Sequence, residues 1–186
     1  MYNHQIIPKT QNFNIIVFLD FPNYIGAISA KLHPICLNWL ERFLDGLGKI
    51  DVRNLYLFKN NGLENSPYLP DFRSNRWEII NRTDKEDIDT WLTIDAAIIT
   101  SRYRRKKKLI VVIIAGDSDY LYPLEKIVQL GSRGILITTQ EIKHHKSEGV
   151  EIVRLPKSIC PKCGRIGVYQ EQWKCWKCEK DGCLFH

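Results

Sequence analysis

The sequence lacks any hydrophobic run long enough to cross a membrane. Its longest apolar stretch begins at Leu109 and ends at Gly116, far short of the roughly 20 residues that a transmembrane helix needs. The first twenty residues also lack the basic, apolar and small-residue order of an export signal. We therefore expect a protein without membrane contact that stays in the cytoplasm.

Cysteine is nearly missing from the first 159 residues, where Cys36 stands alone. The other five cysteines fall within the last 27 residues. Histidine is also scarce, and no Ser-His-Asp arrangement typical of nucleophilic catalysis is present. The adjacent His144 and His145 lie in a polar stretch that we expect to be a surface loop.

Size and charge narrow the class of protein. A chain of 186 residues suits one main domain with a small appendage. A net charge of +6 and a pI near 9.0 favour a polyanionic partner such as nucleic acid.

The hydrophobic pattern alternates between two kinds of segment and predicts an α/β fold, a mainly parallel sheet flanked by helices. Short β-branched runs predict strands at 13–20, 54–58, 109–117, 134–138 and 150–155. Apolar spacings of three or four residues predict helices at about 24–46, 87–103 and 121–130. The polar segment 59–82 predicts a long loop with a short strand at 77–80.

Acidic residues follow two of these strands. Asp20 ends the first, while Asp117 and Asp119 follow the strand that begins at Leu109. Ligands of open α/β sheets gather beyond the carboxyl ends of the strands, so these acids should meet. Asp89 and Asp95 belong to the helix at 87–103, whose buried side we expect to include Ile94 and Ile98 among others.

Each acid taken singly has a simpler interpretation as a turn or helix-capping residue. Capping needs only one oxygen, however, and a second carboxylate beside the first is repelled unless a cation lies between them. Several carboxylates at one edge are therefore typical of a Mg²⁺ or Mn²⁺ site.

Three segments resemble the signatures of the NYN domain, a branch of the PIN-like nuclease superfamily, over residues 13–155. They are "FLDFPNY" with Asp20 and Asn23, "DIDTWLTIDAAI" with Asp89, and "IAGDSDYLYPLEKIVQLGSRGILI" with Asp117 and Asp119. The resemblance implies a Rossmann-like sheet and hydrolysis of RNA phosphodiesters by metal-activated water.

By position, the resemblance implies that Asp20, Asp89 and Asp117 hold Mg²⁺ or Mn²⁺, with Asn23 and Asp119 in support. The sequence departs from the family before the second acid. The family often has Lys-Gly-Val-Asp there, whereas this chain reads Lys-Glu-Asp-Ile-Asp at 85–89. Asp87 or Asp95 therefore remains an alternative to Asp89.

Basic residues in two places suit RNA. Arg73, Arg76, Arg82 and Lys85 precede the acidic helix and are the first candidates for phosphate contacts. The run of six basic residues at 102–108 directly precedes the 109–116 strand and so lies at its opposite end, roughly 25 Å from the acids. Tyr68, Phe72 and Trp77 either stack on bases or hold the loop to the body.

The C-terminal cysteines form two Cys-x-x-Cys pairs, Cys160 with Cys163 and Cys175 with Cys178, separated by eleven residues. Four thiolates complete a tetrahedral Zn²⁺ shell, so residues 158–186 should form a structural zinc ribbon. Cys183 and His186 are alternative ligands. The ribbon's basic and aromatic residues favour RNA contact over docking or dimerisation.

The sequence thus predicts a metal-dependent endoribonuclease with a zinc ribbon that helps to hold RNA. The alternative is an RNA-binding scaffold of the same fold that cleaves poorly. A homodimer is compatible with either. A phosphotransferase or Toprim-like enzyme fits less well, because the first strand ends in Asp20-Phe21-Pro22 rather than in Asp-x-Asp or glutamate.

Overall fold

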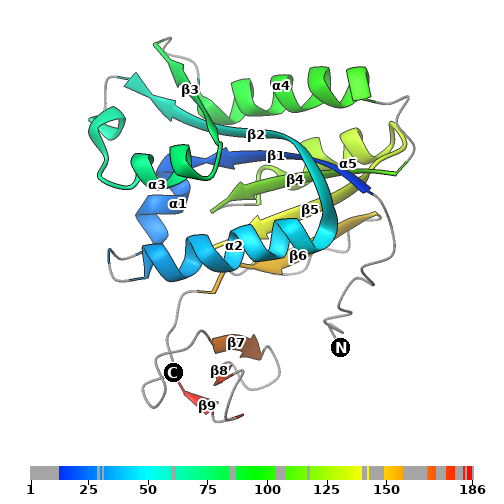
Figure 1. The fold of residues 1–186 in the computed structure, drawn as a ribbon. Coiled ribbons are helices and arrows are strands. Elements are labelled where there is room, and N and C mark those ends of the chain that lie inside the picture. The colour runs from blue at the N-terminus through cyan, green and yellow to red at the C-terminus, as the bar shows by residue number, and fades with distance from the viewer. Residues whose placement is uncertain are drawn as a thin grey trace.

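A six-stranded sheet forms the centre of the protein in the computed structural model (Figure 1). The structure describes residues 13–28, 30, 32–59, 62–83, 87–103, 108–116, 118–139, 142, 149–156, 167–170, 175–178, 182 and 184–185. The strands are β1 (Phe13–Asp20), β2 (Gly48–Phe58), β3 (Glu78–Arg82), β4 (Leu109–Ala115), β5 (Arg133–Thr138) and β6 (Val150–Arg154).

The strands follow the order β3-β2-β1-β4-β5-β6, and every neighbouring pair is parallel. This is the strand order of doubly wound α/β sheets. The predicted α/β fold with a mainly parallel sheet is confirmed.

Helices cover both faces of the sheet. Side chains alternate along each strand, and apolar side chains therefore point to both faces. The helices are α1 (Phe21–Ala27), α2 (His33–Leu47), α3 (Leu69–Ser74), α4 (Ile88–Tyr103) and α5 (Leu121–Val128), with a 3₁₀ turn, η2 (Leu63–Asn65). Ile15, Val17 and Leu19 of β1 pack in the core shared with α1, α2 and α3. Ile16 and Phe18 face the other way, into the core shared with α4 and α5.

The structure corrects two of the predicted boundaries. The single helix expected at 24–46 is two helices, and each has a proline in its first turn, Pro22 in α1 and Pro34 in α2. Proline suits that position because its missing N–H has no helical partner there. β2 begins at Gly48 rather than Asn54, because its polar first half also pairs with β1.

The segment 59–82 is more ordered than the predicted loop. It contains η2, α3 and β3, which pairs with the outer side of β2. The strand expected at 77–80 is therefore present, and it forms an edge of the sheet.

A second, antiparallel sheet lies near the C-terminus. It consists of β7 (Gly167–Gln170), β8 (Cys175–Cys178) and β9 (Leu184–Phe185). Cys175 and Cys178 begin and end β8, and the side chain of Cys178 is buried. Cys160, Cys163, Cys183, His186 and the side chain of Cys175 lie outside the described residues, so the zinc site stays a prediction.

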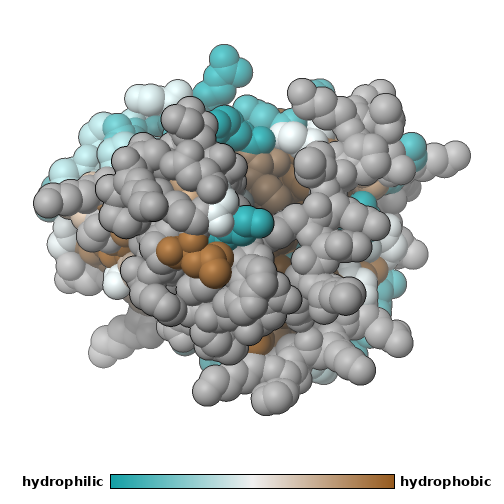
Figure 2. Space-filling model, turned by 90° about the horizontal axis from the view of Figure 1, so that it is seen from below, coloured by the Kyte–Doolittle hydropathy of each residue, from teal (hydrophilic) through white to brown (hydrophobic). Residues whose placement is uncertain are grey.

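Within the described residues, none of the helices combines the length and the apolar character that a membrane span requires. Figure 2 shows both hydrophobic and hydrophilic residues among the described part of the chain in a view from below.

Candidate active site

The candidate site lies where the connections of two neighbouring strands leave to opposite faces of the sheet. After β1 the chain enters α1 on one face, whereas after β4 it enters α5 on the other. Such a point leaves a crevice at the carboxyl edge of a parallel sheet. Asp20 is the last residue of β1, and Gly116 directly follows β4.

Asp20 is buried and accepts three hydrogen bonds from two residues. Its Oδ1 accepts from the backbone N–H of Asn23 at 3.0 Å, so Asp20 also caps α1. Its Oδ2 accepts from Nδ2 of Asn23 at 2.6 Å and from the hydroxyl of Tyr120 at 2.9 Å. The carboxylate is therefore held in one orientation at the strand end.

The same Tyr120 hydroxyl also hydrogen-bonds to Oδ1 of Asp89, in the first turn of α4. A phenol has one proton and donates it to one acceptor at a time. Two carboxyl groups thus converge on a single donor inside the protein, and Tyr120 itself is buried. The arrangement is satisfied when one carboxyl group is protonated or when a cation binds beside them.

The pKa of Asp89 reflects this crowding. Burial raises the pKa of this carboxyl group above its usual range. The negative charges of Asp87 and Asp20 raise it further, while the hydrogen bond from Tyr120 acts in the opposite direction. Burial likewise raises the pKa of Tyr120, so its hydroxyl stays protonated.

Gly116 and Thr139 border the other side of Asn23. A Cβ atom on Gly116 would lie 2.7 Å from Oδ1 of Asn23 and 3.2 Å from Oγ1 of Thr139. Thr139 is buried, and its Oγ1 has no hydrogen-bond partner in the part of the chain that the structure describes. A glycine is thus required for Asn23 to approach the end of β4 this closely.

The predicted acids do not all join this cluster. Asp119 is exposed in the turn before α5. Tyr120 occupies the capping position of α5, and that cap has no side-chain hydrogen bond. Asp117 lies outside the described residues.

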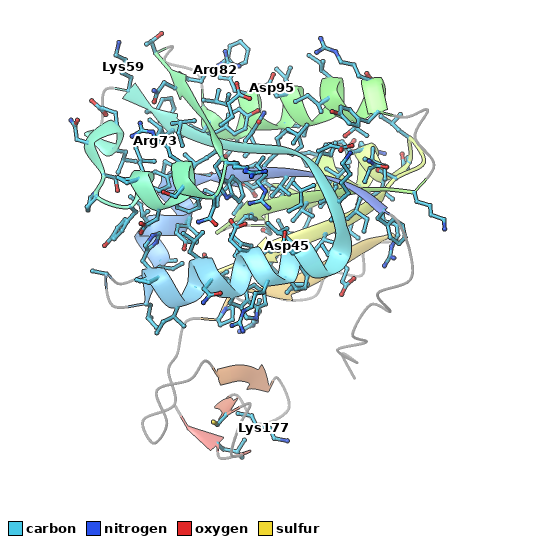
Figure 3. All side chains as sticks on the ribbon, in the orientation of Figure 1. Asp45, Lys59, Arg73, Arg82, Asp95 and Lys177 are labelled. Atoms are coloured by element: carbon cyan, nitrogen blue, oxygen red, sulfur yellow. The ribbon has the colours of Figure 1, made fainter. Side chains whose placement is uncertain are left out.

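Asp95 belongs to a separate group of three polar residues. It accepts from the hydroxyl of Tyr56 at 2.9 Å and from Nη2 of Arg82 at 3.1 Å. Figure 3 shows Arg82 and Asp95 together between β3 and α4. Of these two helix acids, Asp89 is therefore the one that meets Asp20.

Of the arginines predicted to bind RNA, two are exposed and one is engaged in contacts within the protein. Arg73 and Arg76 are exposed, in and just after α3, which lies at the end of the sheet to which the β2 arrow points (Figure 1). Arg82, besides its bond to Asp95, lies over the Trp91 ring at 4.3 Å. Lys85 lies outside the described residues.

The aromatic residues of this segment hold it to the body. Phe72 and Trp77 are buried and meet edge to face at 5.5 Å. Tyr68 is half-buried, with its ring 4.3 Å from that of His33. Burial rules out base stacking for Phe72 and Trp77 in this conformation.

Sequence reasoning missed Tyr120, Gly116 and Thr139 as site residues. Tyr120 directly follows Asp-Ser-Asp, and this position next to the acidic motif could have marked it as a site residue. Gly116 precedes the same motif. Nothing in the sequence marks Thr139, because its role depends on β5 lying beside β4.

The donor set suits a hard divalent cation. Two converging carboxylates and a nearby amide oxygen are ligands that Mg²⁺ and Mn²⁺ prefer. Among the described residues, no group of three or more aspartate, glutamate, histidine or cysteine side chains is placed to hold a metal ion. A third acid from outside those residues, such as Asp117, would be needed to complete a metal site.

Comparison with known proteins supports the fold. No family model matches the sequence, and no curated protein does. The chain is similar to a solved protein of unknown function from Vibrio parahaemolyticus, with a TM-score of 0.56 and 14% identity. The match covers 78% of this chain and 94% of that one. At this identity the likeness shows the fold alone.

Proposed function

We propose that this protein is a metal-dependent endoribonuclease of the NYN or PIN-like type. It would hydrolyse RNA phosphodiester bonds at the carboxyl edge of the sheet. The observation that carries the proposal is the convergence of Asp20 and Asp89 on the hydroxyl of Tyr120. These residues come from three different parts of the fold. A bound cation would offset the repulsion between the two carboxylates.

The first strand-to-helix turn argues against a dinucleotide site, although the strand order is the one that such proteins use. A dinucleotide-binding turn is rich in glycine, which lets the backbone approach the pyrophosphate. Here the turn is Asp20-Phe21-Pro22. A buried carboxylate at that place repels a phosphate unless a cation lies between them.

In this proposal Asp20, Asp89 and Asp117 hold Mg²⁺ or Mn²⁺. When bound, the cation would neutralise charge on the phosphate and activate a water molecule. Asn23 fixes the orientation of Asp20 through two hydrogen bonds. Asp119 is exposed beside the site, where it can orient solvent or substrate.

RNA would approach from the side of α3. Arg73 and Arg76 offer exposed cations there, and guanidinium groups bind phosphate through paired hydrogen bonds. The four paired cysteines would bind one structural zinc ion. Lys177, which is exposed on β8, supports a contact between that module and the RNA backbone.

The test is an incubation of the full chain with labelled single-stranded RNA, structured RNA and DNA, each with Mg²⁺, Mn²⁺ or chelator. We expect RNA cleavage that needs the cation and is lost in Asp20→Asn and Asp89→Asn. Binding without cleavage would favour the scaffold alternative. Cleavage that survives both substitutions would place the active site elsewhere.

A further inference from the structure

The outer face of α4 has no charged residue of its own, although the Arg82 guanidinium lies over the Trp91 ring at the edge of this face. We expected Ile94 and Ile98 on the buried side of this helix, and that prediction was wrong. They are 41% and 42% exposed. The buried side is formed by Ile88, Leu92, Ala96 and Thr100 instead. Apolar residues therefore lie on both faces of the helix.

The exposed residues of α4 form one continuous surface. Thr90, Ile94, Ile98 and Ser101 are exposed, and Trp91 and Ala97 between them are half-buried. Between Asp89 and Arg102 the helix has one charged residue, Asp95, and that carboxylate is paired with Arg82. A helix that is hydrophobic all round is usually buried. Figure 1 shows no described element over this side of α4.

The two ends of α4 carry opposite charges. Asp87 is exposed just before the first turn, and Arg102 is exposed in the last. The sequence continues from Arg102 with a run of five more basic residues up to Lys108. The helix of 16 residues is about 24 Å long, so these charges are well separated within one chain.

The distribution of charge along α4 is self-complementary under a two-fold axis. In an antiparallel pair of identical helices, the acidic end of each meets the basic end of the other. Thr90, Ala97 and Ser101 are small enough to allow helix axes 8–10 Å apart. The isoleucines would then pack near the axis, away from water.

We propose that this face is a homodimer interface, in which α4 of one copy packs antiparallel against α4 of a second copy. The arrangement gives Ile94 and Ile98 an apolar partner and places Arg102 of each copy beside Asp87 of the other. The proposal concerns assembly and does not depend on nuclease activity. If the proposed function also holds, the basic end of each helix lies beside the catalytic acids of the second copy.

The first test is sedimentation of the full chain over a range of concentrations. We expect a reversible dimer of twice the 21.8 kDa chain mass. Ile98→Glu should raise its dissociation constant at least about tenfold without changing the circular dichroism spectrum. Leu130→Glu is the matched control, because Leu130 is 40% exposed but lies beyond α5. A monomer at every concentration, or equal effects of the two variants, would overturn the proposal.

The second test uses charge reversal and keeps the proposal falsifiable if Ile98→Glu misfolds. Asp87→Lys alone places like charges at both contacts of its homodimer, and so does Arg102→Glu alone. Both should therefore dimerise more weakly than the wild type. A mixture of the two pairs Lys with Glu at one contact and Asp with Arg at the other, so heterodimers should form. Failure of the mixture to recover dimer would exclude the antiparallel arrangement.

Discussion

The hydroxyl of Tyr120 lies 2.9 Å from Oδ2 of Asp20, across 100 positions of sequence, and bonds to Asp89 as well. One uncharged donor thus holds together two carboxyl groups that repel each other when ionised. This relationship ties β1, α4 and the β4–α5 connection into one site.

Asp89→Asn should separate a catalytic role from a folding role. We expect RNA cleavage to fall at least about a hundredfold, equivalent to roughly 2.7 kcal/mol of transition-state stabilisation. In chelator the variant should melt at a higher temperature than the wild type near neutral pH, because burial and neighbouring charges disfavour ionised Asp89. Mn²⁺ should raise the melting temperature of the wild type more than that of the variant.

Asp95→Asn is the control for that experiment, since both acids lie on α4. The variant loses the ion pair with Arg82, whose partners are both partly buried. We expect a loss of about 1 kcal/mol in the free energy of unfolding and nearly unchanged cleavage. If cleavage instead depends on Asp95 and not on Asp89, the site has been assigned to the wrong turn of the helix.

Gly116→Ala tests the close approach of Asn23. The added methyl group would lie 2.7 Å from Oδ1 of Asn23, so the Asn23 side chain must shift and its hydrogen bond to Asp20 is disturbed. We expect cleavage to fall about tenfold or more, an energy of roughly 1.4 kcal/mol, in a protein that still folds. Gly46→Ala in α2 meets no atom within 4 Å and should leave cleavage unchanged. Similar rates for both variants would show that the position of Asn23 is unimportant.

His33 should make stability depend on pH. Its Nδ1 lies 3.3 Å from the hydroxyl of Tyr24 and its Nε2 lies 3.2 Å from Oδ2 of Asp71. Burial lowers its pKa from 6.5, although the charge of Asp71 opposes that shift. The unfolded chain therefore binds a proton at higher pH than the folded chain, and stability is lost as pH falls below about 6.5.

Urea unfolding of the wild type and His33→Gln between about pH 7 and pH 5 measures this contribution. The wild type should lose more stability than the variant as pH falls. Asp89 and Glu41 have raised pKa values and act in the opposite direction. Both are present in the two proteins, so the difference isolates His33. Parallel curves would show that His33 does not titrate differently on folding.

Zinc binding is tested most directly at Cys178, the last residue of β8, whose side chain is buried. We expect one zinc ion per chain by elemental analysis and less than about half an equivalent in Cys178→Ser. Cys36→Ser is the control, because Cys36 donates to the carbonyl of Pro156 and serine can do the same. A zinc-free wild-type protein that is fully folded would disprove the four-thiolate site.

RNA contacts near α3 should appear in the salt dependence of binding. Arg73→Ala and Arg76→Ala should each lower the slope of log affinity against log salt by about one unit per lost phosphate contact. Arg82→Ala should mainly reduce stability, because this guanidinium pairs with Asp95 and covers Trp91. An unchanged slope in Arg73→Ala and Arg76→Ala would contradict RNA contacts at α3, and the basic run at 102–108 would be tested next.

The local pattern was enough for the fold class and for most strands of the sheet. β-branched runs predicted β1 and β4 closely, because strands buried on both sides must be continuously apolar. The Asp-Ser-Asp motif and Asp20 pointed to the carboxyl edge, since parallel strands bring their ends together. The hydrophobic pattern did not predict the break between α1 and α2, because apolar residues recur every three or four positions through both helices.

Only the tertiary structure shows that Asp89, and not Asp95, shares a hydrogen-bond partner with Asp20, since their neighbours come from distant strands and loops. Tyr120 selects Asp89, while Tyr56 and Arg82 engage Asp95. The same holds for α4, where spacing alone did not distinguish the core side from the outer side because both are apolar. Periodicity shows which residues share a helix face, but the packing of that helix on β1, β2 and β4 determines which face is buried.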